Sequence, residues 1–276
     1  MPVLRQRVLT AIVLLPIVLG TILFAPLWLF DAVVGLALVL LALEYAALCR
    51  QSLARRIVFS GAIMALFGLA VVPWQAAETV ADSLLIAALA LWLAAPLWLL
   101  TRRQLPNGLK LVAGLPMIAG AGIALHGLKF IHADGRWVLL AFLLVWAADI
   151  GGYAAGRTFG RHKLAPSISP GKTWEGFGGG VLLVLLLGAT AAPWLVARQH
   201  WFAWGLFLLA MAVLSVIGDL VESLLKRQAD VKDSGNLLPG HGGLLDRLDS
   251  LLAVAPVFLL AGFEIGIFGE LSLLGR

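Results

Sequence analysis

Charged side chains and cysteine are scarce in this chain. Asp, Glu, Lys and Arg make up 13% of its 276 residues, whereas 61% of the residues are hydrophobic. Soluble globular domains carry roughly 25% charged residues, so the composition excludes an ordinary soluble domain. It predicts a polytopic helical membrane protein.

The single cysteine and the small net charge exclude further classes of protein. The only cysteine, Cys49, excludes an intramolecular disulfide and a zinc site built from several cysteines. The net charge of +5 is small and unevenly distributed along the chain, so it does not imply binding to nucleic acid. Basic loops that face anionic lipid headgroups account for it better.

Long apolar runs dominate what is present. We predict an all-α fold: an integral membrane bundle of about nine transmembrane helices with the N-terminus in the cytoplasm. Several runs are near the lower limit of roughly 17–25 residues for a span, so eight or ten spans stay open. Arg5 and Arg7 precede the first run, which we interpret as an uncleaved span. The runs cover residues 8–30, 32–49, 57–73, 83–100, 110–128, 137–156, 177–197, 201–222 and 250–268.

Lys and Arg residues fall mainly in alternate loops of this arrangement. With the N-terminus inside, 16 of the 20 lie on the cytoplasmic side, as the positive-inside rule requires. The arrangement divides the chain into an N-terminal region of about five spans (1–136) and a C-terminal catalytic region (137–276). The second region carries two cytoplasmic polar islands, at 149–176 and 219–249. Spans rich in Ala, Leu and Trp, without organelle signals, favour a bacterial inner membrane.

The first polar island begins with a carboxylate in the membrane. Asp149 lies at the edge of the sixth span, where an ionisable residue is a functional candidate; the alternative is a salt bridge to Arg157 or Lys172. Glycines follow it at four-residue spacing (Gly152, Gly156 and Gly160), which indicates close helix packing. Ser169, Lys172 and Thr173 then offer hydroxyls and a cation just before the next helix, whose N-terminus favours anions.

The second polar island places carboxylates on two helices. Asp219, Glu222 or Ser223, and Lys226 share one face of the eighth span, and Asp246 and Asp249 share a face at the start of the ninth. If the two helix ends meet, the three aspartates converge, as carboxylates do around a hard divalent cation. Oxygen ligands favour Mg²⁺ over Zn²⁺. The alternative is a set of helix caps and solvated ion pairs with Arg227 and Arg247.

A glycine-rich turn connects these helices. Backbone N–H groups of Pro239-Gly240-His241-Gly242-Gly243 are suited to a phosphate oxygen. His241 is interpreted either as a phosphate donor or as a loop residue bonded to a backbone carbonyl. Glu44, in the second span, is interpreted as a polar packing contact.

These residues resemble the signature of the phosphatidate cytidylyltransferase (CDP-diacylglycerol synthase) family. The first island is similar to the family's upstream region, through Asp149, Tyr153, Gly156-Arg157, Gly160-Arg161, Ser169-Pro170, Lys172 and Glu175-Gly176. The resemblance covers about residues 145–250, while residues 1–130 match only as hydrophobic spans. The signature positions are Ser223, Lys226-Arg227, Lys232-Asp233, Gly235, Pro239, His241-Gly242-Gly243, Asp246-Arg247 and Asp249.

The resemblance implies a Mg²⁺-dependent membrane enzyme that converts phosphatidate and CTP into CDP-diacylglycerol and pyrophosphate. CTP, phosphatidate and membrane lipids are the expected partners, and the oligomeric state, a homodimer included, stays open. Asp219, Asp246 and Asp249 are expected to hold one or two Mg²⁺ ions. Lys226 and Arg227 are expected to act in catalysis. Asp149, Ser169, Lys172, Ser223, Lys232, His241, Gly242, Gly243 and Arg247 are expected to bind CTP or the lipid phosphate.

Other functions compete with this prediction. A cytidylyltransferase for another lipid phosphate, such as an isoprenoid ether lipid, fits the same motifs. A transporter of an anionic solute predicts charges near the bilayer midplane and an internal repeat, and neither is found here. A CDP-alcohol phosphotransferase needs an Asp-Gly-x-x-Ala-Arg run that the chain lacks.

Overall fold

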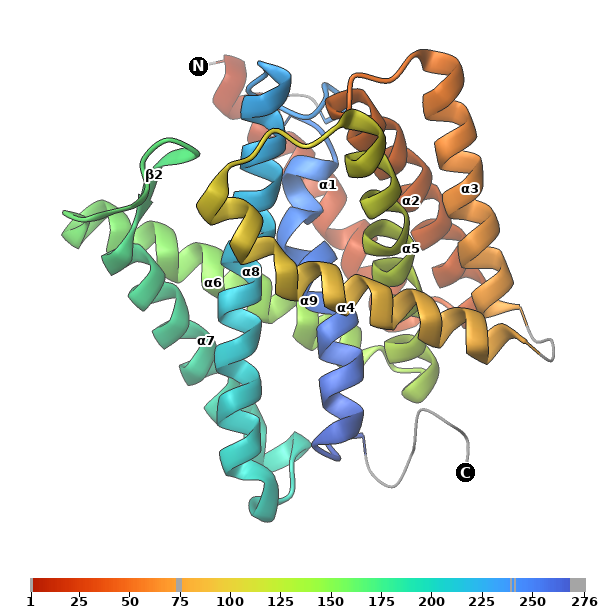
Figure 1. The fold of residues 1–276 in the computed structure, drawn as a ribbon. Helices are drawn as coiled ribbons and strands as arrows, with labels where there is room; N and C mark the ends of the chain where they lie inside the picture. The colour runs from red at the N-terminus through yellow and green to blue at the C-terminus, as the bar shows by residue number, and fades with distance from the viewer. Residues whose placement is uncertain (1, 73–75, 239, 241, 269–276) are drawn as a thin grey trace.

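Nine α-helices and a two-stranded hairpin make up the described part of the structure (Figure 1), a computed structural model that describes residues 2–72, 76–238, 240 and 242–268. The hairpin pairs strands β1 (Lys163–Ala165) and β2 (Ser169–Thr173) antiparallel, and a 3₁₀ turn, η1 (Arg198–His200), precedes α8. The helices are α1 (Pro2–Phe24), α2 (Leu27–Leu48), α3 (Leu53–Val71), α4 (Ala77–Thr101), α5 (Asn107–Ile131), α6 (Arg136–Phe159), α7 (Trp174–Leu195), α8 (Trp201–Ala229) and α9 (Leu245–Glu264).

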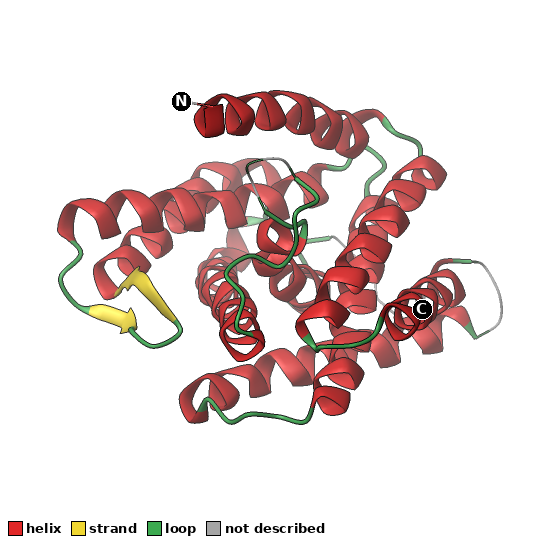
Figure 2. Ribbon diagram, turned by 90° about the horizontal axis from the view of Figure 1, so that it is seen from above, coloured by secondary structure: helices red, strands yellow, loops and turns green. Residues whose placement is uncertain are grey.

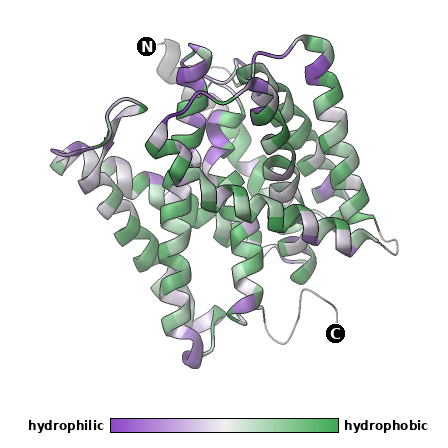
Figure 3. Cartoon of the chain, viewed as in Figure 1, coloured by the Kyte–Doolittle hydropathy of each residue, from purple (hydrophilic) through white to green (hydrophobic). Residues whose placement is uncertain are grey.

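The apolar helices have the dimensions of membrane spans. Within the described residues, α2 to α8 are long and apolar enough to cross a bilayer, and α1 contributes a shorter apolar helix, Ile12–Phe24. The helix α9 is not one of these seven spans, and it carries Asp246, Arg247 and Asp249 in its first turns. Hydrophilic residues gather at the end where the N-terminus lies, whereas the helix bodies are mainly hydrophobic (Figure 3). The prediction of an all-α polytopic membrane protein is confirmed.

Most helix boundaries are shifted from the predicted apolar runs, and two of the differences have a clear physical cause. The first apolar run, 8–30, is divided at Pro26, which lies at the N-cap of α2 and accepts the N–H groups of Leu29 and Phe30 at 3.0 Å. Proline has no N–H to continue a helix and its ring clashes with the preceding turn. The eighth span continues as a helix to Ala229 instead of ending near residue 222, because its polar side chains find partners in neighbouring elements.

The hairpin was not predicted, and it lies at the edge of the helical body (Figure 2). It holds the first polar island against the start of α7. The Thr173 hydroxyl caps α7 by accepting the N–H of Gly176 at 3.1 Å. Glu175 accepts the N–H of Arg161 at 3.1 Å. These bonds fix Lys172, the residue before the cap, in position.

Glycines bring α6 and α7 into backbone contact, as the four-residue spacing predicted. A Cβ atom on Gly176 would lie 2.8 Å from the carbonyl oxygen of Gly152, and one on Gly180 would lie 2.7 Å from that of Ala148. Only residues without side chains permit this approach. The close packing places Asp149, on α6, next to the hairpin and α7.

A similar approach joins α8 to α9. A Cβ atom on Gly218 would lie 2.6 Å from the carbonyl oxygen of Asp249. The Ser250 hydroxyl donates a 2.8 Å hydrogen bond to the Ser215 carbonyl. This antiparallel contact sets Asp219 beside Asp249, so the polar ends of both helices face one another.

Polar contacts also join the helix ends on this side of the molecule. Arg50, after α2, forms a 2.5 Å ion pair with Asp230, after α8. The Gln228 side chain donates to the carbonyl of Arg103, after α4, at 3.3 Å. The loops that follow α2, α4 and α8 therefore share one end of the bundle, as the distribution of Lys and Arg predicted.

Candidate active site

A cavity of about 430 Å³, called the polar cavity because charged side chains lie in its wall, is formed between α6, α7, α8 and the hairpin. Its lining includes Asp149, Ser169, Lys172 and Asp219, so both polar islands contribute. The Lys172 ammonium lies 2.6 Å from a carboxylate oxygen of Asp219. The volume is within the range of roughly 300–1,000 Å³ for small-molecule sites. The structure thus joins the two islands into one candidate site.

Three carboxylates lie in or near this site, Asp149 and Asp219 in the cavity wall and Asp249 next to them. Asp149, Asp219 and Asp249 lie close enough to repel each other electrostatically, and Lys172 interacts favourably with each of them. The Ser223 hydroxyl donates to Asp219 at 3.2 Å, and the Ser250 N–H donates to Asp249 at 2.7 Å. Negative charge collected in this way creates a site for cations, and Lys172 supplies one of them.

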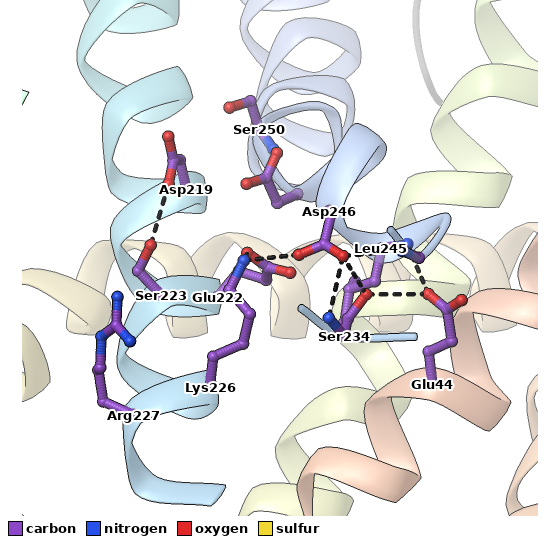
Figure 4. Close-up of polar contacts among 12 residues, drawn as sticks. Glu44, Asp219, Glu222, Ser223, Lys226, Arg227, Ser234, Leu245, Asp246 and Ser250 are labelled. Carbon is purple, nitrogen blue, oxygen red and sulfur yellow. Dashed lines mark hydrogen bonds and ion pairs between the residues drawn. The ribbon is translucent and has the colours of Figure 1, made fainter. Parts of the chain in front are cut away.

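Asp246 belongs to a separate polar network (Figure 4). One of its oxygens accepts the N–H groups of Ser234 at 2.9 Å and of Gly243 at 2.8 Å, together with the Ser234 hydroxyl at 3.0 Å. Its other oxygen accepts a 2.6 Å bond from Lys226, which also pairs with Glu222. Asp246 therefore orders the loop between α8 and α9.

This network separates Asp246 from Asp219 and Asp249, and the binding of a metal ion by these three aspartates stays a prediction. Asp219, Asp246 and Asp249 do not converge, and no three His, Cys, Asp or Glu side chains within the described residues lie close enough together to form a complete set of metal ligands. Asp249 lies beside Asp219, whereas Asp246 lies opposite the next turn of α8, where Lys226 and protein N–H groups occupy both of its oxygens.

The cationic residues predicted for the site lie in different surroundings. Arg227 is exposed and donates a 3.2 Å bond to the Ile168 carbonyl in the hairpin. Lys232 is exposed in the loop after α8. Arg247 is exposed in the first turn of α9 and interacts electrostatically with Asp149. Lys226 is bound to the carboxylates of its own network, whereas Lys172 lines the cavity.

The glycine-rich turn binds a carboxylate instead of presenting all its N–H groups outward. The N–H of Gly243 is bonded to Asp246, and the carbonyl of Gly242 accepts the N–H of Leu238 at 2.9 Å. Gly242 has a φ of 84°, which a residue with a side chain rarely adopts. His241, a predicted phosphate donor, lies outside the described residues.

Glu44 is the residue that the sequence interpretation undervalued. From α2, its carboxylate accepts the N–H groups of Leu244 at 3.1 Å and Leu245 at 2.8 Å, and the Ser234 hydroxyl at 3.1 Å. An anion at a helix N-terminus is favourable, and here it anchors α9 and the loop together (Figure 4). A carboxylate inside an apolar span was the available signal.

We expect Glu44→Gln to impair this anchor, because an amide NH₂ would face backbone donors. Leaving buried donors unsatisfied costs about 1–3 kcal/mol, so the free energy of unfolding should fall by that amount and turnover should fall with it. Thermal unfolding in detergent and turnover would be measured together. Glu78→Gln, at an exposed position in the first turn of α4, is the matched control. Unchanged stability and turnover in Glu44→Gln would remove Glu44 from this role.

The fold and the site together define a polytopic membrane protein whose carboxylates, cations and glycine-rich turn meet at one end of a helical bundle. The chain belongs to the cytidylyltransferase family, whose model matches residues 5–263. This confirms the resemblance that the two islands indicated.

Similar proteins carry one name. A Pseudomonas aeruginosa protein named phosphatidate cytidylyltransferase is 37% identical over 266 residues, which cover 92% of this chain and 95% of that protein. A Haemophilus influenzae protein of the same name is 48% identical over 125 residues, 44% of this chain and 43% of that protein. A Bacillus subtilis protein of that name is 48% identical over 132 residues, 46% of this chain and 48% of that protein.

Proposed function

We propose that this protein transfers the cytidylyl group of CTP to phosphatidate, with CDP-diacylglycerol and pyrophosphate as products, for phospholipid synthesis. The observation that carries the proposal is the 2.6 Å contact of Lys172 with Asp219, which joins both islands in one cavity at the helix ends. Family membership and the names of the similar proteins support the same reaction. We expect a lipid to reach a site at the helix ends from the side and a nucleotide to reach it from the aqueous phase.

The chemistry requires positioning more than a strong base. A phosphatidate oxygen is already nucleophilic near neutral pH, and it attacks the α-phosphorus of CTP. A new P–O bond forms as the bond to the leaving pyrophosphate breaks. Lys172 and Arg227 neutralise the triphosphate, and Ser169 and Ser223 orient phosphate oxygens through hydrogen bonds. Fixed charges of this kind stabilise the transition state because they need no rearrangement during the reaction.

Mg²⁺ is the metal that the donor chemistry supports. Asp219 and Asp249 are adjacent and Asp149 is within electrostatic range of both, so oxygen donors suited to a hard cation are present. Asp246 fits less well, because protein donors occupy both of its oxygens. Bound there, Mg²⁺ would neutralise phosphate charge and favour departure of pyrophosphate.

Removal of divalent metal is therefore expected to abolish turnover. Purified protein treated with EDTA should lose activity and recover it when Mg²⁺ is added back, while the helical signal in circular dichroism is unchanged. Ca²⁺, which accepts longer and less regular coordination, should restore much less. Full turnover after chelation would contradict the metal proposal and leave the family assignment intact.

We also propose that the site faces the cytoplasm of a bacterial inner membrane. The helix ends that carry Arg50, Arg103 and Gln228 lie together with the loop after α8. Most of the Lys and Arg residues are on this side in the predicted arrangement, and the positive-inside rule places such an end in the cytoplasm.

A substrate panel tests the proposed function. Detergent-purified protein would receive labelled CTP and Mg²⁺ with either phosphatidate or an isoprenoid ether lipid phosphate. Lipid-soluble label should form with phosphatidate at the higher kcat/KM. Product with the ether lipid alone would favour the alternative substrate, and no product with either would refute the proposal.

A further inference from the structure

A second cavity, of about 410 Å³, lies between α1, α2, α5, α6 and α9. Ile22, Leu38 and Leu251 form part of its wall and are almost fully buried. Leu15 is 46% exposed and Val33 is 39% exposed, so they border the cavity on its open side. Five helices thus surround an apolar space that also reaches the molecular surface.

One charged residue lies in the otherwise apolar wall of this cavity. Among the described residues that line it, Arg247 is the only charged one. Arg247 also interacts electrostatically with Asp149, which lines the polar cavity. Arg247 therefore lines the apolar cavity and lies within electrostatic range of the polar one, which contains Lys172 and Asp219.

An apolar space of this size that reaches the molecular surface is suited to an apolar occupant. Protein interiors are close-packed, with few voids larger than a water molecule, and an apolar cavity does not hold water well. In a membrane protein, acyl chains are available from the side. A helix of a second copy would fill the space without using Arg247, whereas a lipid phosphate would pair with it.

We infer that this cavity binds an acyl chain of the lipid substrate, with the lipid phosphate at Arg247. The inference rests on the proposed function and adds that the two substrates bind in different cavities. The polar cavity at Lys172 and Asp219 takes the nucleotide, and the apolar cavity takes the lipid. Arg247 is suited to binding the lipid phosphate, because its planar guanidinium binds two phosphate oxygens at once.

Narrowing the cavity tests this division. Ala37 lines the cavity from α2, and Ala37→Phe would occupy space that a long chain needs. We expect the ratio of kcat/KM for dipalmitoyl over dioctanoyl phosphatidate to fall by about tenfold or more, since one methylene in an apolar pocket already changes kcat/KM about tenfold. The KM for CTP should stay unchanged. Ala32→Phe, on the same helix at an exposed position that does not line the cavity, should leave the ratio unchanged.

A second variant provides the same test if Ala37→Phe does not fold. Leu15→Trp narrows the open side from α1, where exposure makes the substitution tolerable, and it should lower the same ratio. An unchanged ratio in the folded variants, or an equal loss with both lipids, would overturn the inference. Failure of the unmodified protein to use either phosphatidate would instead refute the proposed function.

Discussion

Asp219→Asn is expected to lower kcat by about 10²–10³, the usual effect of removing one preorganised electrostatic group from a catalytic site. Asp219 forms an ion pair with the Lys172 ammonium and accepts a hydrogen bond from the Ser223 hydroxyl. It also lies beside Asp249, where a cation would be held. The asparagine keeps the size of the side chain but loses its charge. Turnover of labelled CTP at saturating phosphatidate measures the effect.

The matched control is Asp134→Asn. Asp134 is a half-exposed carboxylate that forms a 2.5 Å ion pair with Arg136 between α5 and α6, on the opposite end of the bundle. Its substitution should change kcat by less than about twofold, because exposed ion pairs contribute little. Near-normal turnover in Asp219→Asn would remove Asp219 from the catalytic site.

Lys226→Met is expected to destabilise the fold as well as the site. Lys226 is the shared cation of Glu222 and Asp246, whose side chains are 4% and 5% exposed. Removing one partner of a buried ion pair costs about 3–5 kcal/mol. The free energy of unfolding should fall by that amount, and turnover should fall with the disordered loop.

A double variant separates charge from packing. Glu222→Gln combined with Lys226→Met removes one stranded carboxylate, so it should recover part of the lost stability. Unfolding in detergent compares the single and double variants. Equal stability of Lys226→Met and the unmodified protein would show that the Lys226–Glu222–Asp246 network does not hold α8 and α9 together.

The sequence predicted those parts of the fold that depend on periodic patterns. Hydropathy located the apolar helices, and the spacing of Gly152 and Gly156 predicted the backbone contact of α6 with α7. The alternation of basic loops predicted that Arg50 and the loop after α8 share one end. Each of these features repeats along the chain, so it can be recognised without knowledge of distant contacts.

The remaining features depend on partners far apart in the sequence. Glu44 and Ser234 are 190 residues apart, yet they are hydrogen-bonded, and no local pattern around Glu44 specifies that partner. Asp246 and Asp249 share a helical face, which predicted one metal site. The register of α9 against α8 places only Asp249 beside Asp219, whereas Asp246 forms an ion pair with Lys226.

The central claim is that the α-phosphorus of CTP is transferred to phosphatidate at the cavity formed by Lys172 and Asp219. It is tested most directly with CTP that carries the label on either the α- or the γ-phosphate. With purified protein, phosphatidate and Mg²⁺, α-label should pass into the lipid phase, γ-label should remain in aqueous pyrophosphate, and Asp219→Asn should suppress both products. Transfer of γ-label to the lipid, or no transfer of α-label, would contradict the account.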